Sequence, residues 1–123
     1  MATINLTQSD FESTVGQGTV LVDFWAEWCG PCRQFGPIFE GASEKHPDVT
    51  FAKVDTDAEQ GIAGAFQITS IPTLMAFRDG VLVYSQPGAL PAKALEQVIE
   101  AVNGLNMDDV RRQIAEQQAE QQG

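Results

Sequence analysis

The chain contains only two cysteines, and both lie in the four-residue segment Cys29-Gly30-Pro31-Cys32. Two cysteines at this spacing serve three kinds of chemistry. A zinc or iron–sulfur site normally takes four protein ligands, often from two such pairs, and this sequence has no second pair. A structural disulfide gains little stability from closing so short a loop. We therefore favour the third kind, a dithiol that exchanges electrons with disulfides. A metal shared between two chains and a purely structural disulfide are the alternatives.

The elements expected around the two cysteines favour a redox dithiol. Residues 19–26, rich in β-branched and aromatic residues, predict a strand covered on both faces. An apolar stripe over residues 35–42 predicts a helix that begins directly at the cysteines. The first N–H groups of a helix have no internal partner and carry partial positive charge, so they would stabilise a thiolate at Cys29. Cys32, one turn later, could resolve a mixed disulfide, and the Gly-Pro dipeptide between them permits a tight turn into the helix.

Two charged residues are expected inside the predicted sheet. Asp23 shares a strand face with Leu21 and Trp25, so its carboxyl group would lie in apolar surroundings, which raise the pKa of an acid and suit it to proton transfer. Neutralisation by a hydrogen bond or an ion pair is the plainer alternative. Lys53 is equally unexpected in the strand predicted for residues 49–55. If the two strands are neighbours, both side chains can meet beneath the cysteines, and we favour a functional role for them.

Three further residues could belong to the site or to the scaffold alone. Pro72 precedes the strand predicted for residues 73–78, where a proline is either an ordinary edge residue or a cis proline. Trp28 stands just outside the helix start, where an exposed aromatic side chain suits substrate contact, although a place in the core is also possible. His46 is expected at a helix end, with no chemistry.

The composition limits the possible partners. A chain of 123 residues is expected to form one domain with a real core. Its net charge of −10, from 17 acidic and 7 basic residues, would be repelled by phosphate backbones and anionic lipid, so we expect no nucleic-acid and no membrane partner. The N-terminal segment has neither the basic start nor the apolar core of a signal peptide. We therefore expect a cytoplasmic protein.

The remaining elements follow from turn and helix signals. Asp79-Gly80 is the strongest short hairpin signal. Strands that alternate with helices require a parallel sheet, and a late hairpin adds antiparallel strands to it. The predicted fold class is therefore a three-layer α/β domain with helices on both faces of the sheet. The other expected elements are a helix capped by Thr7 and ended by Gly16 and Gly18, a weak helix over residues 57–66, strands over 73–78 and 81–86, and a helix from Pro91 to Gly104.

The last residues differ from the rest in character. Residues 1–105 are expected to form the domain, and residues 106–123 a glutamine-rich tail. Asn106 is a good N-cap, and Val110 and Ile114 are spaced i, i+4. The other residues can bury little apolar surface. We expect at most a frayed helix over residues 107–115 and disorder beyond Glu116.

Several segments together resemble the thioredoxin family, in one register from about residue 4 to residue 103. They are VDFWAEWCGPC (22–32), Pro37, AKVDTD (52–57), IPT (71–73), FRDG (77–80) and PGAL (87–90). The resemblance implies a thioredoxin-like three-layer α/β/α sandwich, in which a mixed five-stranded sheet has the strand before the cysteines near its centre.

The resemblance also implies a role for each matching position. Cys29 would be the attacking thiolate, and thioredoxins are themselves a standard example of a thiol with a lowered pKa at this spacing. Cys32 would be the buried resolving thiol, Asp23 the acid–base group that helps to deprotonate it, and Lys53 the residue that tunes Asp23. Pro31 would shape the first helical turn, and Pro72 would be a cis proline facing the disulfide. The flat apolar docking surface would consist of Trp28, Gly30, Ile71, Gly88 and Ala89.

The family further implies how electrons arrive. They would come from NADPH through a flavoprotein thioredoxin reductase, so the chain itself would hold no cofactor and no metal. The partners would be that reductase and disulfide-containing client proteins. The protein itself would be a monomer. A thioredoxin-like oxidant or isomerase and a thioredoxin-fold binding subunit are the two other functions we consider.

The sequence departs from the family in three places. The tail lies beyond the usual family end, Pro87 precedes Gly88 where a non-proline residue is common, and Gly36 and Gly41 lie inside the helix after the cysteines. Each of these two glycines should cost that helix about 0.5–1 kcal/mol relative to alanine.

Overall fold

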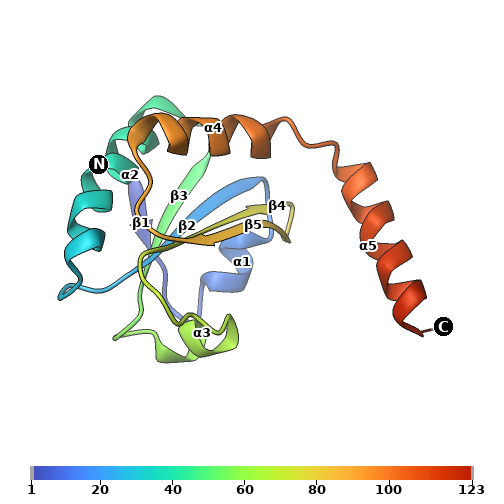
Figure 1. Cartoon of the computed structure of the whole chain (residues 1–123), viewed down its shortest axis with the longest axis horizontal. Helices are drawn as coiled ribbons and strands as arrows, with labels where there is room; N and C mark the ends of the chain where they lie inside the picture. The colour runs from blue at the N-terminus through green and yellow to red at the C-terminus, as the bar shows by residue number, and fades with distance from the viewer. Residues whose placement is uncertain (1, 123) are drawn as a thin grey trace.

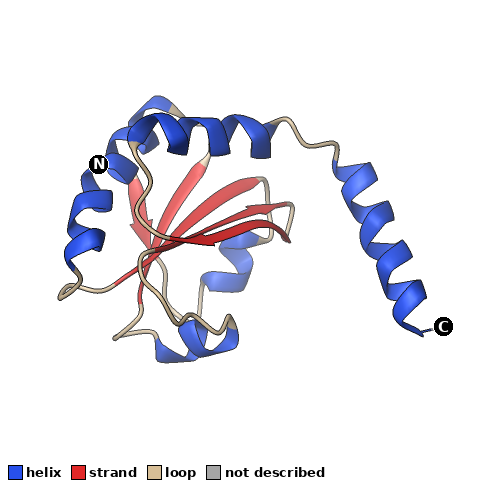
Figure 2. Cartoon of the chain, viewed as in Figure 1, coloured by secondary structure: helices blue, strands red, loops and turns tan. Residues whose placement is uncertain are grey.

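The computed structural model describes residues 2–122 and has three layers, with helices on both faces of a five-stranded sheet (Figure 1, Figure 2). The strands are arranged in the order β1-β3-β2-β4-β5. The elements are β1 (Thr3–Asn5), α1 (Phe11–Val15), β2 (Thr19–Trp25), α2 (Gly30–Lys45), β3 (Thr50–Asp55), α3 (Gln60–Ala65), β4 (Thr73–Arg78), β5 (Val81–Pro87), α4 (Ala92–Asn103) and α5 (Met107–Gln122).

Strand β2, which leads to the cysteines, is the third of the five strands. It runs parallel to β3, with Asp23 opposite Lys53, and antiparallel to β4. Five of its seven residues, Val20 to Phe24, are buried, because both sheet faces are covered by helices. The central position that the resemblance implied for this strand is confirmed.

The alternation of side chains along β2 divides the core into two layers. Val20, Val22 and Phe24 face α1 and α3, where they pack near Phe11 and Ile62. Leu21 faces the opposite layer, which contains α2 and α4. Because successive residues of a strand point to opposite faces, Asp23 lies on the same face as Leu21, beneath α2. The expected three-layer fold class is confirmed.

Strand β1 was not predicted from the residue pattern. It has three residues, too few to show an alternation, and it pairs in parallel only with β3. The predicted cap of α1 is also wrong. The helix begins at Phe11 after Asp10, and the backbone N–H of Thr7 donates to Asp10 Oδ1 at 2.7 Å, so these two residues form a turn that precedes the helix.

The predicted hairpin between β4 and β5 is confirmed. Asp79 and Gly80 have φ values of 51° and 84°, so both central residues of the turn are left-handed, as the twist of a tight hairpin requires. The backbone of Asp79 also bonds to Gly18: its N–H donates to the Gly18 carbonyl at 2.9 Å. The hairpin tip is thereby tied to the start of β2.

The last helix is longer than predicted. Helix α5 continues to Gln122, whereas we expected helix only to residue 115. Asn106 caps it as expected, since the Asp109 N–H donates to Asn106 Oδ1 at 3.2 Å. Met107 is buried, and the side chains of residues 111–121 are exposed. The second half of α5 points away from the sheet (Figure 1), so its helical form rests on the helix propensity of alanine, glutamine and glutamate.

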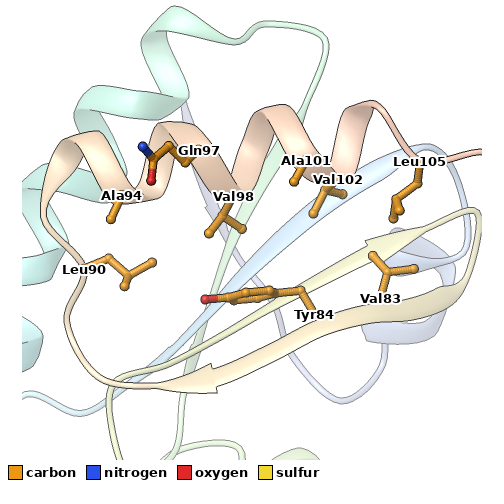
Figure 3. A pocket seen from close by; sticks show the side chains of 9 residues that line it. All are labelled: Val83, Tyr84, Leu90, Ala94, Gln97, Val98, Ala101, Val102 and Leu105. Atoms are coloured by element: carbon orange, nitrogen blue, oxygen red, sulfur yellow. The ribbon is translucent and has the colours of Figure 1, made fainter.

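An apolar groove of about 400 Å³ lies between α4 and β5 (Figure 3). Its lining residues are all uncharged, and the ring of Tyr84 lies along it with the hydroxyl group toward Leu90. Burial raises the pKa of Tyr84. None of the predicted site residues lines this groove. No helix within residues 2–122 is long and apolar enough to cross a membrane.

Candidate redox site

The two cysteines lie at the start of α2, as the sequence predicted. Cys29 is the N-cap residue, and its sulfur accepts a hydrogen bond from the Cys32 backbone N–H at 3.3 Å. The two sulfurs form a disulfide, with the Cα atoms 5.2 Å apart. Pro31 occupies the first turn of the helix, where a missing N–H costs nothing. The helix N-terminus therefore points its free N–H groups at Cys29.

A loop distant in sequence faces Cys29. The Ile71–Pro72 peptide bond is cis, and the Ile71 carbonyl oxygen lies 3.6 Å from the Cys29 sulfur, across 42 positions of the chain. In the disulfide state that sulfur carries no proton, so this is a contact that could become a hydrogen bond only after reduction. The cis state that the resemblance implied for Pro72 is confirmed.

Gly88 directly follows β5 and lies beside the Ile71–Pro72 loop. Its backbone N–H donates to the Pro72 carbonyl at 2.7 Å, and its φ of 109° is a conformation that L side chains rarely adopt. Ala89 follows it and is exposed. Gly30 is also exposed, beside Cys29. The structure thus joins the loop residues of the predicted docking surface through Pro72.

Trp28 is exposed to 67%, which places it on the surface and not in the core. Its indole Nε1–H donates to Asp57 Oδ2 at 2.9 Å. We did not predict Asp57 as a site residue. It lies in a turn after β3, and nothing in the local sequence indicates that this turn would meet the residue before Cys29.

Asp23 is fully buried, and neither carboxylate oxygen has a hydrogen-bond partner among residues 2–122. Burial raises its pKa from 3.8 to about 7, and the positive charge of Lys53 opposes part of that rise. The hydrogen bond that one form of the plainer alternative requires is therefore absent among the described residues, whereas Lys53 supplies a positive charge that acts on the carboxyl group. The acid would exchange its proton near neutral pH.

Lys53 lies opposite Asp23 in the β2–β3 register and is half-buried. Its Nζ atom lies 4.7 Å from the centre of the Trp25 ring, a cation–π distance. A cavity of about 370 Å³ beside α2 is lined by both of these residues and by Cys32. Trp25 and the charged cavity residues Glu27, Arg33 and Glu40 were not predicted as part of the site, because their place depends on how α2 crosses the sheet.

His46 plays a structural part. Its Nε2 lies 2.7 Å from Glu96 Oε2, which ties the end of α2 to α4. Within residues 2–122, no three histidine, cysteine, aspartate or glutamate side chains gather where they could hold a metal ion.

The model of the family described as Thioredoxin matches residues 2–101. The chain belongs to the thioredoxin family. "Putative thioredoxin 2" of Streptomyces coelicolor is 55% identical to it over 120 residues, which cover 97% of this chain and 90% of that protein. The thioredoxin of Bacillus subtilis is 37% identical over 100 residues, 80% of this chain and 96% of the relative.

Solved thioredoxin structures share the fold. A mutant thioredoxin of Halobacterium salinarum is 34% identical with a TM-score of 0.77, over 85% of this chain and 93% of its own. The Plasmodium falciparum thioredoxin is 38% identical with a TM-score of 0.74, over 80% of this chain and 97% of its own. The family model ends before α5, whereas the match to the Streptomyces relative continues into it.

Proposed function

We propose that this thioredoxin-family protein reduces disulfide bonds in other proteins by thiol–disulfide exchange. The observation that supports this most strongly is the position of Cys29, at the N-terminus of α2 and 3.6 Å from the Ile71 carbonyl of an exposed loop. A client strand that lies along this loop would bring its disulfide to the sulfur of Cys29.

The reaction starts from the reduced dithiol. The Cys29 thiolate attacks one sulfur of the client disulfide, the client S–S bond breaks, and one client thiolate leaves and takes up a proton. Cys32, once deprotonated, attacks the Cys29 sulfur in the mixed disulfide. The second client thiol is released. The dithiol has been oxidised to the Cys29–Cys32 disulfide, and the two electrons that it lost have reduced the client disulfide to two thiols.

Asp23 is the acid–base group that we assign to the second step. Cys32 lines the cavity beside α2, and Asp23 lies on the sheet face beneath that helix. With a pKa of about 7, the carboxylate can accept a proton at neutral pH as Cys32 becomes a nucleophile. Lys53 favours the ionised carboxylate and thereby sets how readily Asp23 takes part.

The surface around the dithiol would bind the client. Trp28 contributes an exposed ring held by Asp57, and Gly30, Gly88 and Ala89 add little side-chain bulk around it. The Ile71 backbone would pair with an extended client segment. Such a surface suits many clients, because backbone pairing does not depend on the client sequence.

The partners follow from the family. Electrons would come from NADPH through a flavoprotein thioredoxin reductase, with no cofactor bound to this chain. We propose a cytoplasmic monomer in which residues 1–105 form the active domain. A reducing compartment would keep the dithiol ready to attack.

Reduction of insulin by dithiothreitol tests the proposal. The protein should accelerate insulin reduction, and Cys29→Ser should abolish the acceleration while leaving the fold intact by circular dichroism. A rate equal to that of dithiothreitol alone would instead favour a binding subunit. Faster oxidation or reshuffling of a reduced protein, without insulin reduction, would favour an oxidant or isomerase.

A further inference from the structure

The cavity beside α2 is lined by one face of that helix. Arg33, Gly36, Pro37 and Glu40 line it at i, i+3, i+4 and i+7, a spacing that places all four on one side. The buried stripe of α2, which contains Phe35 and Phe39, faces the sheet instead. This second face therefore places charged side chains close to the cavity wall formed by β2 and β3.

Gly36 brings the Lys53 ammonium close to this face. A Cβ atom at Gly36 would lie 4.0 Å from Lys53 Nζ, so the ammonium lies directly against the helix at that turn. The Trp25 ring contacts the ammonium, with Nζ 4.7 Å from the ring centre. Glu40 lies one turn further along the same face of α2.

Glu40 is held in place from the edge of the sheet. The Thr3 hydroxyl of β1 donates a hydrogen bond to Glu40 Oε1, and the Glu40 side chain is half-buried. Strand β1 pairs with β3, the strand that carries Lys53. Strand β1 thus holds the Glu40 carboxylate, and its neighbour β3 carries the Lys53 ammonium. Both charged residues line the same cavity.

The charged groups around Lys53 come from three sides. Asp23 faces it from β2, Glu40 and Arg33 line the cavity from α2, and Glu27 lines it from the loop before the cysteines. The Arg33 Nε–H donates to the Glu27 carbonyl oxygen at 3.1 Å, so Arg33 is engaged with the loop backbone.

We propose that Glu40 is a positioning residue of the dithiol site, which attracts the Lys53 ammonium toward α2 and so limits how strongly Lys53 stabilises ionised Asp23. The lysine is shared between two carboxylates, one buried in the sheet and one at the cavity wall. Glu40 would thereby keep Asp23 protonated closer to neutral pH. This proposal deepens the proposed function, since it rests on Asp23 as the proton acceptor.

The test is a titration of the Asp23 carboxyl carbon by ¹³C NMR in the oxidised full-length protein. Glu40→Gln should lower the Asp23 midpoint by about half a pH unit, the order expected when one nearby charge is removed. Glu100→Gln is the matched control, because it removes the same charge from an exposed position of α4 outside the cavity. It should leave the midpoint unchanged.

A second pair of variants separates the two routes of action. In a Lys53→Met background, Glu40→Gln should shift the midpoint by less than a third of its effect in the parent. An equal shift in both backgrounds would overturn the positioning role and leave only a direct effect of the charge. No shift in the parent would overturn the proposal altogether. If Glu40→Gln does not fold, Glu40→Ala takes its place, because alanine is a strong helix former.

The titration needs no turnover, so its failure is distinct from a failure of the proposed function. If the parent does not reduce insulin, the proposed function is wrong, and the titration still decides whether Glu40 acts on Asp23 through Lys53. If the parent is active, the pH profile of the Cys32-dependent step in Glu40→Gln should move to lower pH by the same amount as the Asp23 midpoint.

Discussion

The two cysteines at the start of α2 have different neighbours, and we propose different roles for them on that ground. Both are buried, with 5% exposure each. Cys29 caps α2 and lies 3.6 Å from the Ile71 carbonyl oxygen, whereas Cys32 lies inside the first turn and lines the cavity beside α2. We expect a client segment that pairs with the Ile71 loop to meet Cys29 first.

Trapping of mixed disulfides tests this assignment. With Cys32→Ser, the resolving thiol is absent, so Cys29 should retain client proteins as covalent adducts that survive non-reducing electrophoresis. Cys29→Ser is the matched control and should retain none. Adducts on Cys29→Ser in place of Cys32→Ser would show that the roles are reversed.

A buried Asp23 with a raised pKa should affect stability as well as the proposed chemistry. Its pKa is about 7 in the folded chain and near 3.8 when unfolded, so the folded state binds more protons between these values. The stability of the parent should therefore fall as the pH rises from about 4 to above 7, by up to about 4 kcal/mol from this group.

Asp23→Asn should remove this pH dependence. The variant and the parent should unfold at similar urea concentrations at pH 4, where the carboxyl group is neutral. At pH 8 the variant should be more stable, by about 2–4 kcal/mol, and should reduce disulfides more slowly. A constant difference between pH 4 and pH 8 would contradict a buried, titrating Asp23.

At the scale of elements, α2 contains two glycines after its first residue, and they have different surroundings. Gly41 is exposed and has open space where a Cβ atom would be, whereas a Cβ atom at Gly36 would contact Lys53 Nζ. A glycine inside a helix is less stable than alanine through backbone entropy alone. Only Gly36 has a neighbour that belongs to the site.

The two alanine variants should therefore behave differently. Gly41→Ala should stabilise the protein by about 0.5–1 kcal/mol in urea unfolding and leave the rate of insulin reduction unchanged. Gly36→Ala should gain similar helix stability, but its methyl group would contact the Lys53 ammonium and shield it from water, so the pH profile of reduction should shift. An unchanged profile for Gly36→Ala would show that this contact does not alter the action of Lys53 on Asp23.

For the whole molecule, α5 lies at the end of the sheet opposite to the dithiol. It contacts the start of β5, where Leu82 and Val83 line a hollow together with Val110 and Ile114. Arg111 also lies 3.7 Å from Asp79 at the hairpin tip, an exposed ion pair that contributes little. Buried Met107 is therefore the main anchor of the helix.

Two truncations separate the anchor from the rest of the tail. Removal of residues 106–123 should cost about 1–3 kcal/mol of stability, the value of burying a side chain such as Met107. Removal of residues 116–123 should leave stability unchanged. Both proteins should reduce insulin at the parent rate. A loss of activity in either one would show that α5 contributes to client or reductase binding, and that the active domain extends beyond residue 105.

Local patterns were sufficient to predict most of the fold and the position of the two cysteines at the start of a helix. The apolar strand at residues 19–26, the helix stripe that follows it and the Asp79-Gly80 turn are each determined by neighbours in sequence. The same patterns marked Asp23 and Lys53, because a charged residue on an apolar strand face stands out without any knowledge of the partner strand. The family resemblance then supplied the expected roles of Pro72 and Gly88. The local sequence left Pro72 open between an edge residue and a cis proline, and it gave no signal for Gly88.

Tertiary structure alone decided the features that join distant segments. The contact of Cys29 with Ile71, the bond of Trp28 to Asp57, and Glu40 held by Thr3 all connect separate elements, and their geometry follows from strand order and helix crossing. Strand β1 forms only because β3 offers it a free edge. The length of α5 was underestimated because we gave more weight to missing burial than to helix propensity. The sequence thus determined which residues can react, and the packing of α2 over the sheet decided which charges surround them.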